Sequence, residues 1–291
     1  MHVGTAPDSW GVWFANDPLQ TPWSRYLDEV VLAGYDAVEL GPFGYLPTEP
    51  ARVADELGTR SLRLTGATIS VDLSSPAAST DLPANAPAIC DVLEHLDAHY
   101  LVVLDHGYFD RNGAITGPRE LDDSAWQTVA SIMHRLGEYT QARGIHTVLH
   151  PHADTTIQFE SQIERFLEVT DPGLVNLCLD VGHHAYAGGE PASFFRKHHT
   201  RVPYLHLKDV NTSITERTRQ SHQPMSAAIA QGGFTDLGQG NVDLLGLRDV
   251  ASAIHYDGWA IVEQDMYPAP FDQPLPIATR NRQFLRDNNF G

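Results

Sequence analysis

Cysteine is scarce in this chain, as are basic residues and long apolar runs. Its 291 residues include two cysteines, Cys90 and Cys178, and both lie in apolar surroundings without the spacing of a metal or redox motif. Two buried, reduced thiols are the simplest interpretation, and a disulfide between them is the alternative. Cysteine chemistry therefore gives no direct indication of function.

Positive charge is equally limited. Lysine and arginine total 19 residues against 37 of aspartate and glutamate, which gives a formal net charge of −18. A nucleic-acid or anionic-membrane partner would need a basic face, so we expect neither. The opening MHVGTAPDSW lacks the regions of a signal peptide, and no apolar run reaches the ~20 residues of a membrane helix. These absences predict a cytoplasmic protein.

Short runs of β-type residues alternate with longer stretches of helical periodicity along the whole chain. We expect strands at 2–6, 36–40, 62–69, 99–105, 146–150, 175–180, 204–208 and 259–264. Such alternation implies parallel strands joined by right-handed crossovers, and eight units close into a barrel. An open doubly wound sheet is the alternative. It would carry a Gly-rich phosphate loop after the first strand, where this chain reads APDSWGVW. The sequence therefore predicts an α/β fold, a (β/α)8 TIM barrel in which residues 1–291 form one domain.

Histidines and carboxylates stand at the ends of four consecutive predicted strands. His150 and His152 end the fifth strand and share one face, because strand side chains alternate. Asp180, His206 and Glu263 end the next three strands. A lone Asp or His at such a place is usually a helix cap. Burying four such side chains at one edge of a barrel would cost much free energy unless a cation bound them.

We therefore expect a single divalent-metal site formed by His150, Asp180, His206 and Glu263. Two carboxylates and two neutral imidazoles make a mixed nitrogen and oxygen set. Such a set suits Mn²⁺, Co²⁺, Fe²⁺ or Zn²⁺ better than Ca²⁺ or Mg²⁺, which prefer oxygen ligands. The sequence does not choose among the four metals.

Several neighbouring residues are candidates for contact with a substrate. Lys208 lies two residues after His206 and would share its strand face, although a surface lysine paired with Asp209 is an equal alternative. His183 follows Asp180 by three residues. Both side chains could therefore reach the edge at which the metal is expected.

Weaker candidates lie at other strand ends and in the first loop. Glu39 ends the second strand and His106 follows the fourth, where helix caps would look the same. Trp13 lies beside Trp10 and Phe14 in the first loop. These aromatic rings could form an apolar wall for a polyol ring, or could simply pack the top of the barrel.

Four ordered blocks resemble the sugar phosphate isomerase/epimerase superfamily, whose members have a xylose isomerase-like TIM barrel. They are HPH at 150–152, LDVGHHAYAGGEP at 179–191, HLKD at 206–209 and VEQD at 262–265. Within the superfamily they are most similar to inosose dehydratase, which removes water from 2-keto-myo-inositol. The resemblance covers nearly the whole chain.

The resemblance implies a metal-dependent lyase of carbohydrate metabolism, in inositol catabolism, that acts on a polyhydroxy ketone. The metal would stabilise an enediolate formed from the substrate. Glu263 or His152 would take the carbon-bound proton, and Lys208 or His183 would assist departure of the hydroxyl as water.

The fifth strand departs from the pattern of the sugar epimerases in this superfamily, which generally place a glutamate where this chain has His150. In those epimerases this glutamate and the one on the last strand are the two bases that exchange the substrate's proton. Replacing it by histidine removes one base and leaves the metal with less negative charge around it, so that it is more Lewis-acidic. Both changes favour dehydration over epimerisation. His150 could itself serve as a base. After HPH the chain continues Ala153-Asp154-Thr155 instead of the usual Gly-Thr pair, and APDSWGVW differs from the usual dehydratase opening.

Other functions remain as alternatives. A sugar isomerase or epimerase would use the same scaffold without losing water. A non-catalytic sugar-binding barrel is less favoured, because all four predicted metal positions hold competent donors. A related endonuclease is disfavoured by the acidic charge. The long excursion 209–240 could be a lid or a subunit contact, the latter in a homo-oligomer such as a dimer or tetramer.

Overall fold

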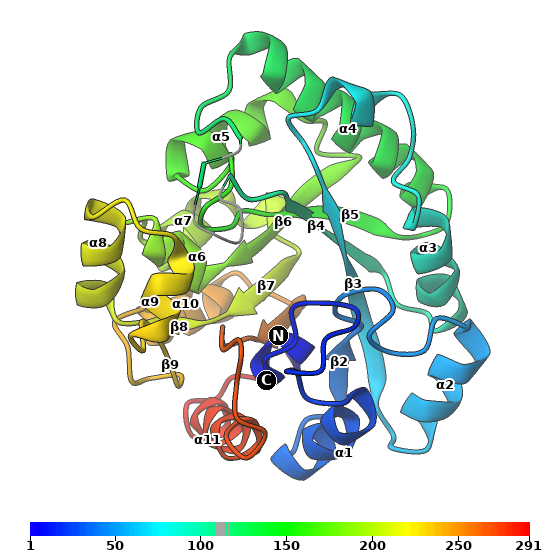
Figure 1. The fold of residues 1–291 in the computed structure, drawn as a ribbon, viewed down its shortest axis with the longest axis vertical. Coiled ribbons are helices and arrows are strands. Elements are labelled where there is room, and N and C mark those ends of the chain that lie inside the picture. Colours follow the sequence, from blue (N-terminus) through cyan, green and yellow to red (C-terminus); the bar gives the residue numbers. More distant parts are fainter. Residues whose placement is uncertain (109–113, 116) are drawn as a thin grey trace.

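Eight parallel strands close into a barrel at the centre of the molecule (Figure 1). The computed structural model describes residues 1–108, 114–115 and 117–291. Around the barrel the strands follow the order β1-β10-β7-β6-β5-β4-β3-β2. They are β1 (His2–Thr5), β2 (Ala37–Glu39), β3 (Arg63–Val71), β4 (Tyr100–Asp105), β5 (His146–His150), β6 (Val175–Asp180), β7 (Tyr204–Leu207) and β10 (Trp259–Val262). The predicted single-domain (β/α)8 barrel is confirmed.

Within the described residues, each β/α unit contributes one of the eight helices that cover the outside of the barrel (Figure 1). They are α1 (Trp23–Ala33), α2 (Pro50–Gly58), α3 (Ala86–His95), α4 (Asp123–Gln141), α5 (Glu160–Val169), α7 (Pro191–His198), α10 (Leu244–Ala253) and α11 (Pro274–Asp287). Two of these helices illustrate the residues that start and end a helix. Asp122 caps α4 by accepting a hydrogen bond from the backbone N–H of Ala125 (2.8 Å), and Gly34 ends α1 in the left-handed region.

The structure also contains elements that the sequence pattern did not predict. Residues after β6 form the short helix α6 (Val181–Tyr186) in place of a loop, because Asp180 Oδ1 caps it by accepting from the backbone N–H of His183 (2.8 Å). Three short 3₁₀ segments, η1 (Pro7–Trp10), η2 (Pro76–Ser79) and η3 (His199–Arg201), were not anticipated either.

The excursion 209–240 forms a small structure of its own beside the barrel (Figure 1, yellow). It contains α8 (Thr212–Gln220), α9 (Met225–Ala230) and a two-stranded antiparallel ladder of β8 (Asp209–Val210) and β9 (Phe234–Thr235). The buried Asp209 carboxylate closes it by accepting hydrogen bonds from four backbone N–H groups, those of Val210, Gly238, Gly240 and Val242. The excursion is therefore an ordered extension of the seventh unit.

Apolar side chains fill the lower part of the barrel interior. A cluster of Ala6, Val102, Val148, Cys178, Tyr204 and Ile261 occupies it, while a larger core lies between the strands and the surrounding helices. Both cysteines are free and buried, as predicted. Because the floor of the barrel is packed, open space and polar side chains are left at the C-terminal strand ends. Within the described part of the chain, no helix has both the length and the apolar character needed to cross a bilayer.

Candidate active site

The four predicted metal ligands meet at the C-terminal ends of neighbouring strands β5, β6, β7 and β10. His150, Asp180, His206 and Glu263 each offer one donor atom, and these atoms lie within 4.8 Å of one another. Asp180 Oδ2 lies 3.3 Å from His150 Nε2 and 3.8 Å from His206 Nδ1. All four residues are buried. The strand register produces this meeting, since Asp180 of β6 pairs directly with His206 of β7.

Glu39 determines which nitrogen of His206 faces this group. Its carboxylate lies 2.8 Å from His206 Nε2 and accepts a hydrogen bond from it. His206 Nδ1 is thereby directed toward Glu263, whose Oε2 lies 3.0 Å away. His150 faces the same group through Nε2, which lies 3.3 Å from Asp180 Oδ2. A buried imidazole that is oriented by a carboxylate behind it, as His206 is by Glu39, fits a metal ligand.

Lys208 brings a positive charge into the same group. Its ammonium lies 2.9 Å from Glu263 Oε2 and 3.3 Å from both Asp180 Oδ2 and Asp265 Oδ2. It also donates to His183 Nε2 at 3.0 Å. Although burial acts to lower the pKa of Lys208, these carboxylates raise it well above its usual value. The ammonium therefore partly neutralises the carboxylates, and a metal ion would share that role.

The surrounding charges also change the pKa of other site residues. Burial acts to raise the pKa of Glu263, but His206 and Lys208 outweigh it and hold the carboxyl below its usual range. Burial lowers the pKa of His152 to about 3. Its Nδ1 donates to the backbone carbonyl of Ala153 (2.7 Å), so Nε2 is the acceptor. Glu263 is thus a carboxylate and His152 a neutral imidazole.

A cavity of about 280 Å³ opens directly above these residues. Its size is near the lower end of the ~300–1,000 Å³ range of small-molecule sites, and it suits one sugar ring better than a longer chain. Trp13 and Phe14 form an apolar side, and Met225 of α9 closes another. The ionisable side chains that line it are Asp8, Glu39, His150, His152, His206, Lys208, Glu263 and Asp265.

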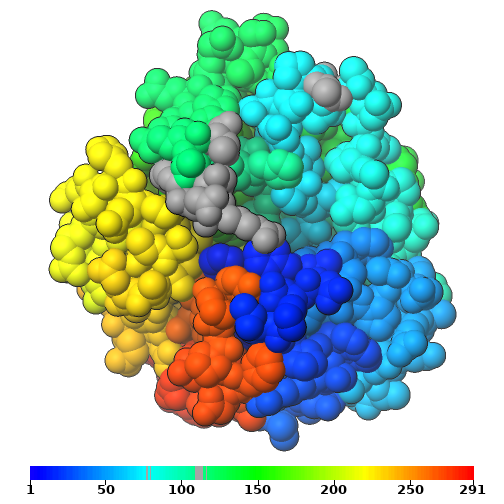
Figure 2. All heavy atoms as spheres, viewed as in Figure 1, coloured from blue at the N-terminus to red at the C-terminus, as the bar shows by residue number. Residues whose placement is uncertain are grey.

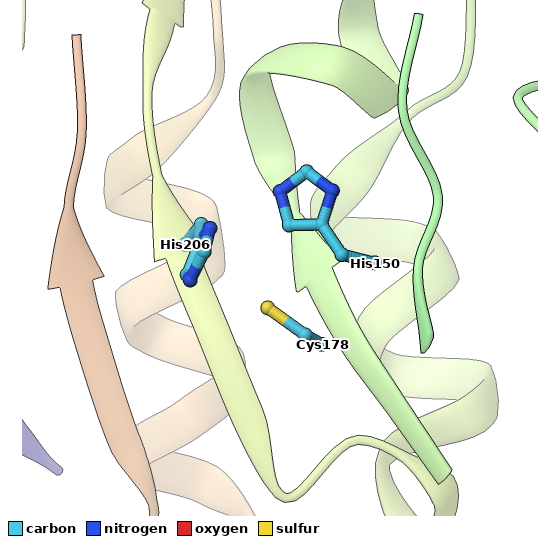
Figure 3. A group of neighbouring side chains, drawn as sticks. All are labelled: His150, Cys178 and His206. Atoms are coloured by element: carbon cyan, nitrogen blue, oxygen red, sulfur yellow. The ribbon is translucent and has the colours of Figure 1, made fainter. Parts of the chain in front are cut away.

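Two further groups of donor atoms overlap with this site. His150, Cys178 and His206 project toward one another from adjacent strands (Figure 3). Cys178 lies two residues before Asp180 in β6, so its thiol is on the same strand face, farther from the C-terminal end. His152, His183 and Asp265 form another group. The Lys208 ammonium lies against both groups that contain carboxylates, 3.3 Å from Asp265 Oδ2 and 2.9 Å from Glu263 Oε2, so it does not distinguish between them. The group with both Asp180 and Glu263 fits a divalent ion best, because two carboxylates balance its charge.

Not every predicted substrate contact lies at the cavity. Trp13, Glu39 and Lys208 line it, whereas His183 lies behind Lys208 with 1% of its surface exposed. His106 is solvent-exposed and is not among the lining residues that the structure describes. The Asp180 cap turns His183 into α6. Contact of His183 and His106 with a substrate stays a prediction.

Two lining carboxylates were missed from the sequence. Asp265 lies two residues after Glu263, and alternation along an extended segment could have placed both on one face. Asp8 lies in η1, directly after β1, where only its position at a strand end was informative. The closed barrel brings these two segments together: Trp13 stacks on Tyr267, with ring centroids 5.2 Å apart. Figure 2 shows the N-terminal segment (blue) against the segment around residue 270 (orange).

Comparison with known proteins agrees with this fold. Inosose dehydratase of Lacticaseibacillus casei is 28% identical to this chain, over 98% of this chain and 96% of its own length. The structure of an L-ribulose 3-epimerase superposes with a TM-score of 0.71 at 16% identity, covering 99% of this chain and 94% of its own. The structure of the IOLI protein with a bound zinc atom superposes with a TM-score of 0.70 at 14% identity, covering 98% of each chain. At such identities these structures show a shared fold.

The family model of the xylose isomerase-like TIM barrel matches residues 27–288. The match leaves out β1, η1 and the start of α1 at the N-terminal end, and residues 289–291 at the other. The resemblance inferred from the four sequence blocks is therefore confirmed, and the chain belongs to the xylose isomerase-like TIM barrel family.

Proposed function

We propose that this protein is a metal-dependent dehydratase that acts on a cyclic polyhydroxy ketone such as 2-keto-myo-inositol. The observation that carries the proposal is the cavity lined by His150, His206, Glu263 and Lys208, with the buried Asp180 carboxylate in contact with the Lys208 ammonium. The inosose dehydratase relatives support the same activity, since they are enzymes of this kind and match almost the full chain.

The residues fit a divalent ion held by His150, Asp180, His206 and Glu263. One imidazole nitrogen from each of His150 and His206 and the two buried carboxylates form a mixed donor set that suits Zn²⁺, Mn²⁺, Co²⁺ or Fe²⁺. The zinc atom in the IOLI structure is consistent with such a set. When bound, the ion would polarise the substrate's carbonyl group and make the neighbouring carbon-bound proton more acidic.

The protein's own side chains would remove the carbon-bound proton and hold the substrate in position. Glu263 is the favoured base, because it is ionised and lines the cavity, and Nε2 of His152 is the other available acceptor. Lys208 lies beside Glu263 and would bind the substrate's oxygens from the floor of the cavity. His183 and Asp265 hold its ammonium in place. Trp13 and Phe14 would pack against the apolar face of the ring.

An isomerase or epimerase is the second candidate. Glu263 and His152 both line the cavity, so two groups are available to remove and return a proton. Product mass separates the two candidates. The metal-loaded protein should be incubated with 2-keto-myo-inositol and a panel of ketoses, and each reaction followed by mass spectrometry. Loss of ~18 mass units, one water, is the result we expect. A product of unchanged mass would support the isomerase, and no reaction with any substrate would contradict both.

A further inference from the structure

Asp8 is a cavity-lining carboxyl that has no role in the function proposed so far. It belongs to η1, the turn that follows β1. Its Oδ1 accepts a hydrogen bond from Trp13 Nε1 at 2.7 Å. Its Oδ2 is buried and has no hydrogen-bond partner among the described residues. A buried carboxyl oxygen without a partner at the wall of a substrate cavity calls for an explanation.

The turn that carries Asp8 is held rigidly from both sides. Ser9 Oγ donates to the backbone carbonyl of Val262 (3.1 Å), which ties the turn to the last strand. Gly11 has a φ of +70°, and a Cβ there would lie 2.6 Å from the carbonyl oxygen of Met266. The buried Trp10 donates to Glu29 (2.9 Å). Asp8 is therefore fixed relative to Glu263 and the cavity, as a group that acts on a substrate must be.

Charge balance separates Asp8 from the other three carboxylates around Lys208. Asp180 and Glu263 belong to the proposed metal group, and Asp265 lies 3.3 Å from the ammonium. Asp8 Oδ2 lies 3.8 Å from it, beyond hydrogen-bond distance. Burial and then the charge of Asp265 raise the pKa of Asp8 well above its usual value, against the opposing effect of Lys208. Four carboxyl groups thus share the one Lys208 ammonium, which lies farthest from Asp8, and a proton retained on Asp8 reduces the excess of negative charge.

We propose that Asp8 is the catalytic acid that protonates the departing hydroxyl group of the substrate. The inference rests on the dehydratase function proposed above and assigns a step for which the sequence suggested Lys208 or His183. The base removes the proton from the carbon next to the carbonyl, and that electron pair forms the new C=C bond. The C–O bond of the neighbouring carbon breaks, and its oxygen leaves as water with the proton from Asp8 Oδ2. The base then loses a proton to solvent and Asp8 regains one, so the net reaction is substrate to product and water.

A purely structural role for Asp8 makes a different prediction. If Asp8 serves only to hold Trp13, Asp8→Asn should behave as the wild type, because the amide oxygen still accepts from Trp13 Nε1. If Asp8 delivers a proton, Asp8→Asn keeps the loop in place and removes the acid. The two roles are therefore separable by one nearly isosteric substitution.

The test follows two signals in D₂O with 2-keto-myo-inositol and the metal-loaded protein. NMR reports exchange of the substrate's carbon-bound proton, which needs only the base, and mass spectrometry reports loss of water. For Asp8→Asn we expect water loss to fall ~10²–10⁴-fold, the usual contribution of a general acid, while exchange continues. The control is Asp17→Asn in the same loop, which accepts from Tyr267 and does not line the cavity in the described structure; both signals should stay as in the wild type.

Two results would overturn the inference while leaving the dehydratase function intact. One is a rate of water loss in Asp8→Asn within about threefold of the wild type, far below the ~10²-fold that a general acid contributes. The other is an equal fall in the rates of proton exchange and water loss in Asp8→Asn. That result would mean that Asp8 acts in substrate binding or in removal of the carbon-bound proton. If the wild-type protein exchanges the proton but never releases water, the proposed function itself fails, and this step fails with it.

Discussion

Glu39 and His206 are joined by a 2.8 Å hydrogen bond, although they come from β2 and β7, which are not neighbours in the barrel. Glu39 was expected to contact the substrate. It lines the cavity, but its carboxylate also orients the imidazole of a proposed metal ligand. The bond leaves His206 Nδ1 facing Glu263 and Asp180.

Glu39→Ala should therefore weaken metal binding. Removing such a carboxylate typically lowers metal affinity ~10–100-fold, because the imidazole loses its orientation and part of its basicity. Glu39→Gln should have a smaller effect, since its amide oxygen still accepts from Nε2. Titration calorimetry with Zn²⁺ or Mn²⁺ measures both variants, and unchanged affinity in Glu39→Ala would show that His206 is oriented by other contacts.

Asp180→Asn should remove metal binding without unfolding α6. The carboxylate caps this helix through Oδ1, and an asparagine oxygen can do the same, but the amide is a poor ligand for a divalent transition metal. Cys178→Ala is the matched control, because Cys178 lies two residues before Asp180 in the same strand and is not one of the four proposed ligands. Metal content measured by mass spectrometry should fall in Asp180→Asn alone. Loss of metal in Cys178→Ala instead would indicate that the ion binds to His150, Cys178 and His206.

Lys208→Met should destabilise the metal-free protein. The ammonium neutralises Asp180, Glu263 and Asp265, and removing one partner of a buried ion pair costs about 3–5 kcal/mol. A divalent ion would supply the missing positive charge, so added metal should stabilise this variant more than the wild type. Urea unfolding with and without Zn²⁺ tests both statements. A variant as stable as the wild type without metal would contradict the charge balance described above.

Asp209→Asn should loosen the excursion that carries Met225 to the cavity. An amide NH₂ would face backbone N–H donors that now meet a carboxylate oxygen, and each lost bond to a charged group costs about 1.5–3 kcal/mol. We expect faster proteolysis and hydrogen exchange within residues 211–240 and a higher KM. Asp243→Asn is the control, because asparagine can still cap α10. Unchanged exchange in Asp209→Asn would show that the excursion is held by its other contacts.

His184 should make the protein less stable in mild acid. It is buried against Phe194, and burial lowers its pKa to about 4. The unfolded chain binds the proton at its ordinary pKa of ~6.5, so the free energy of unfolding should fall by about 3 kcal/mol as pH decreases from 7 to 4. His184→Leu should remove this part of the pH dependence, and the exposed His95→Gln should keep it. Equal pH slopes for His184→Leu and the wild type, from urea unfolding, would contradict the assignment.

The strand pattern by itself predicted the barrel and most of its site. Alternation of short apolar runs with helical periodicity is local, so the eight strands were predicted to within about two residues of their observed ends. The metal group followed because parallel strands must bring their C-terminal ends to one edge. His150, Asp180, His206 and Glu263 could therefore be grouped without knowing any distance.

Only the tertiary structure decided which other side chains join them. Closure of the barrel sets β1 beside β10, which brings Asp8 to Lys208 although 200 residues separate them in the chain. It also turns Glu39 toward His206 and, through the cap at Asp180, moves His183 behind Lys208. These placements depend on strand register and on how loops pack. Periodicity carries no information about either, because it records which face a residue takes and not which residue it meets.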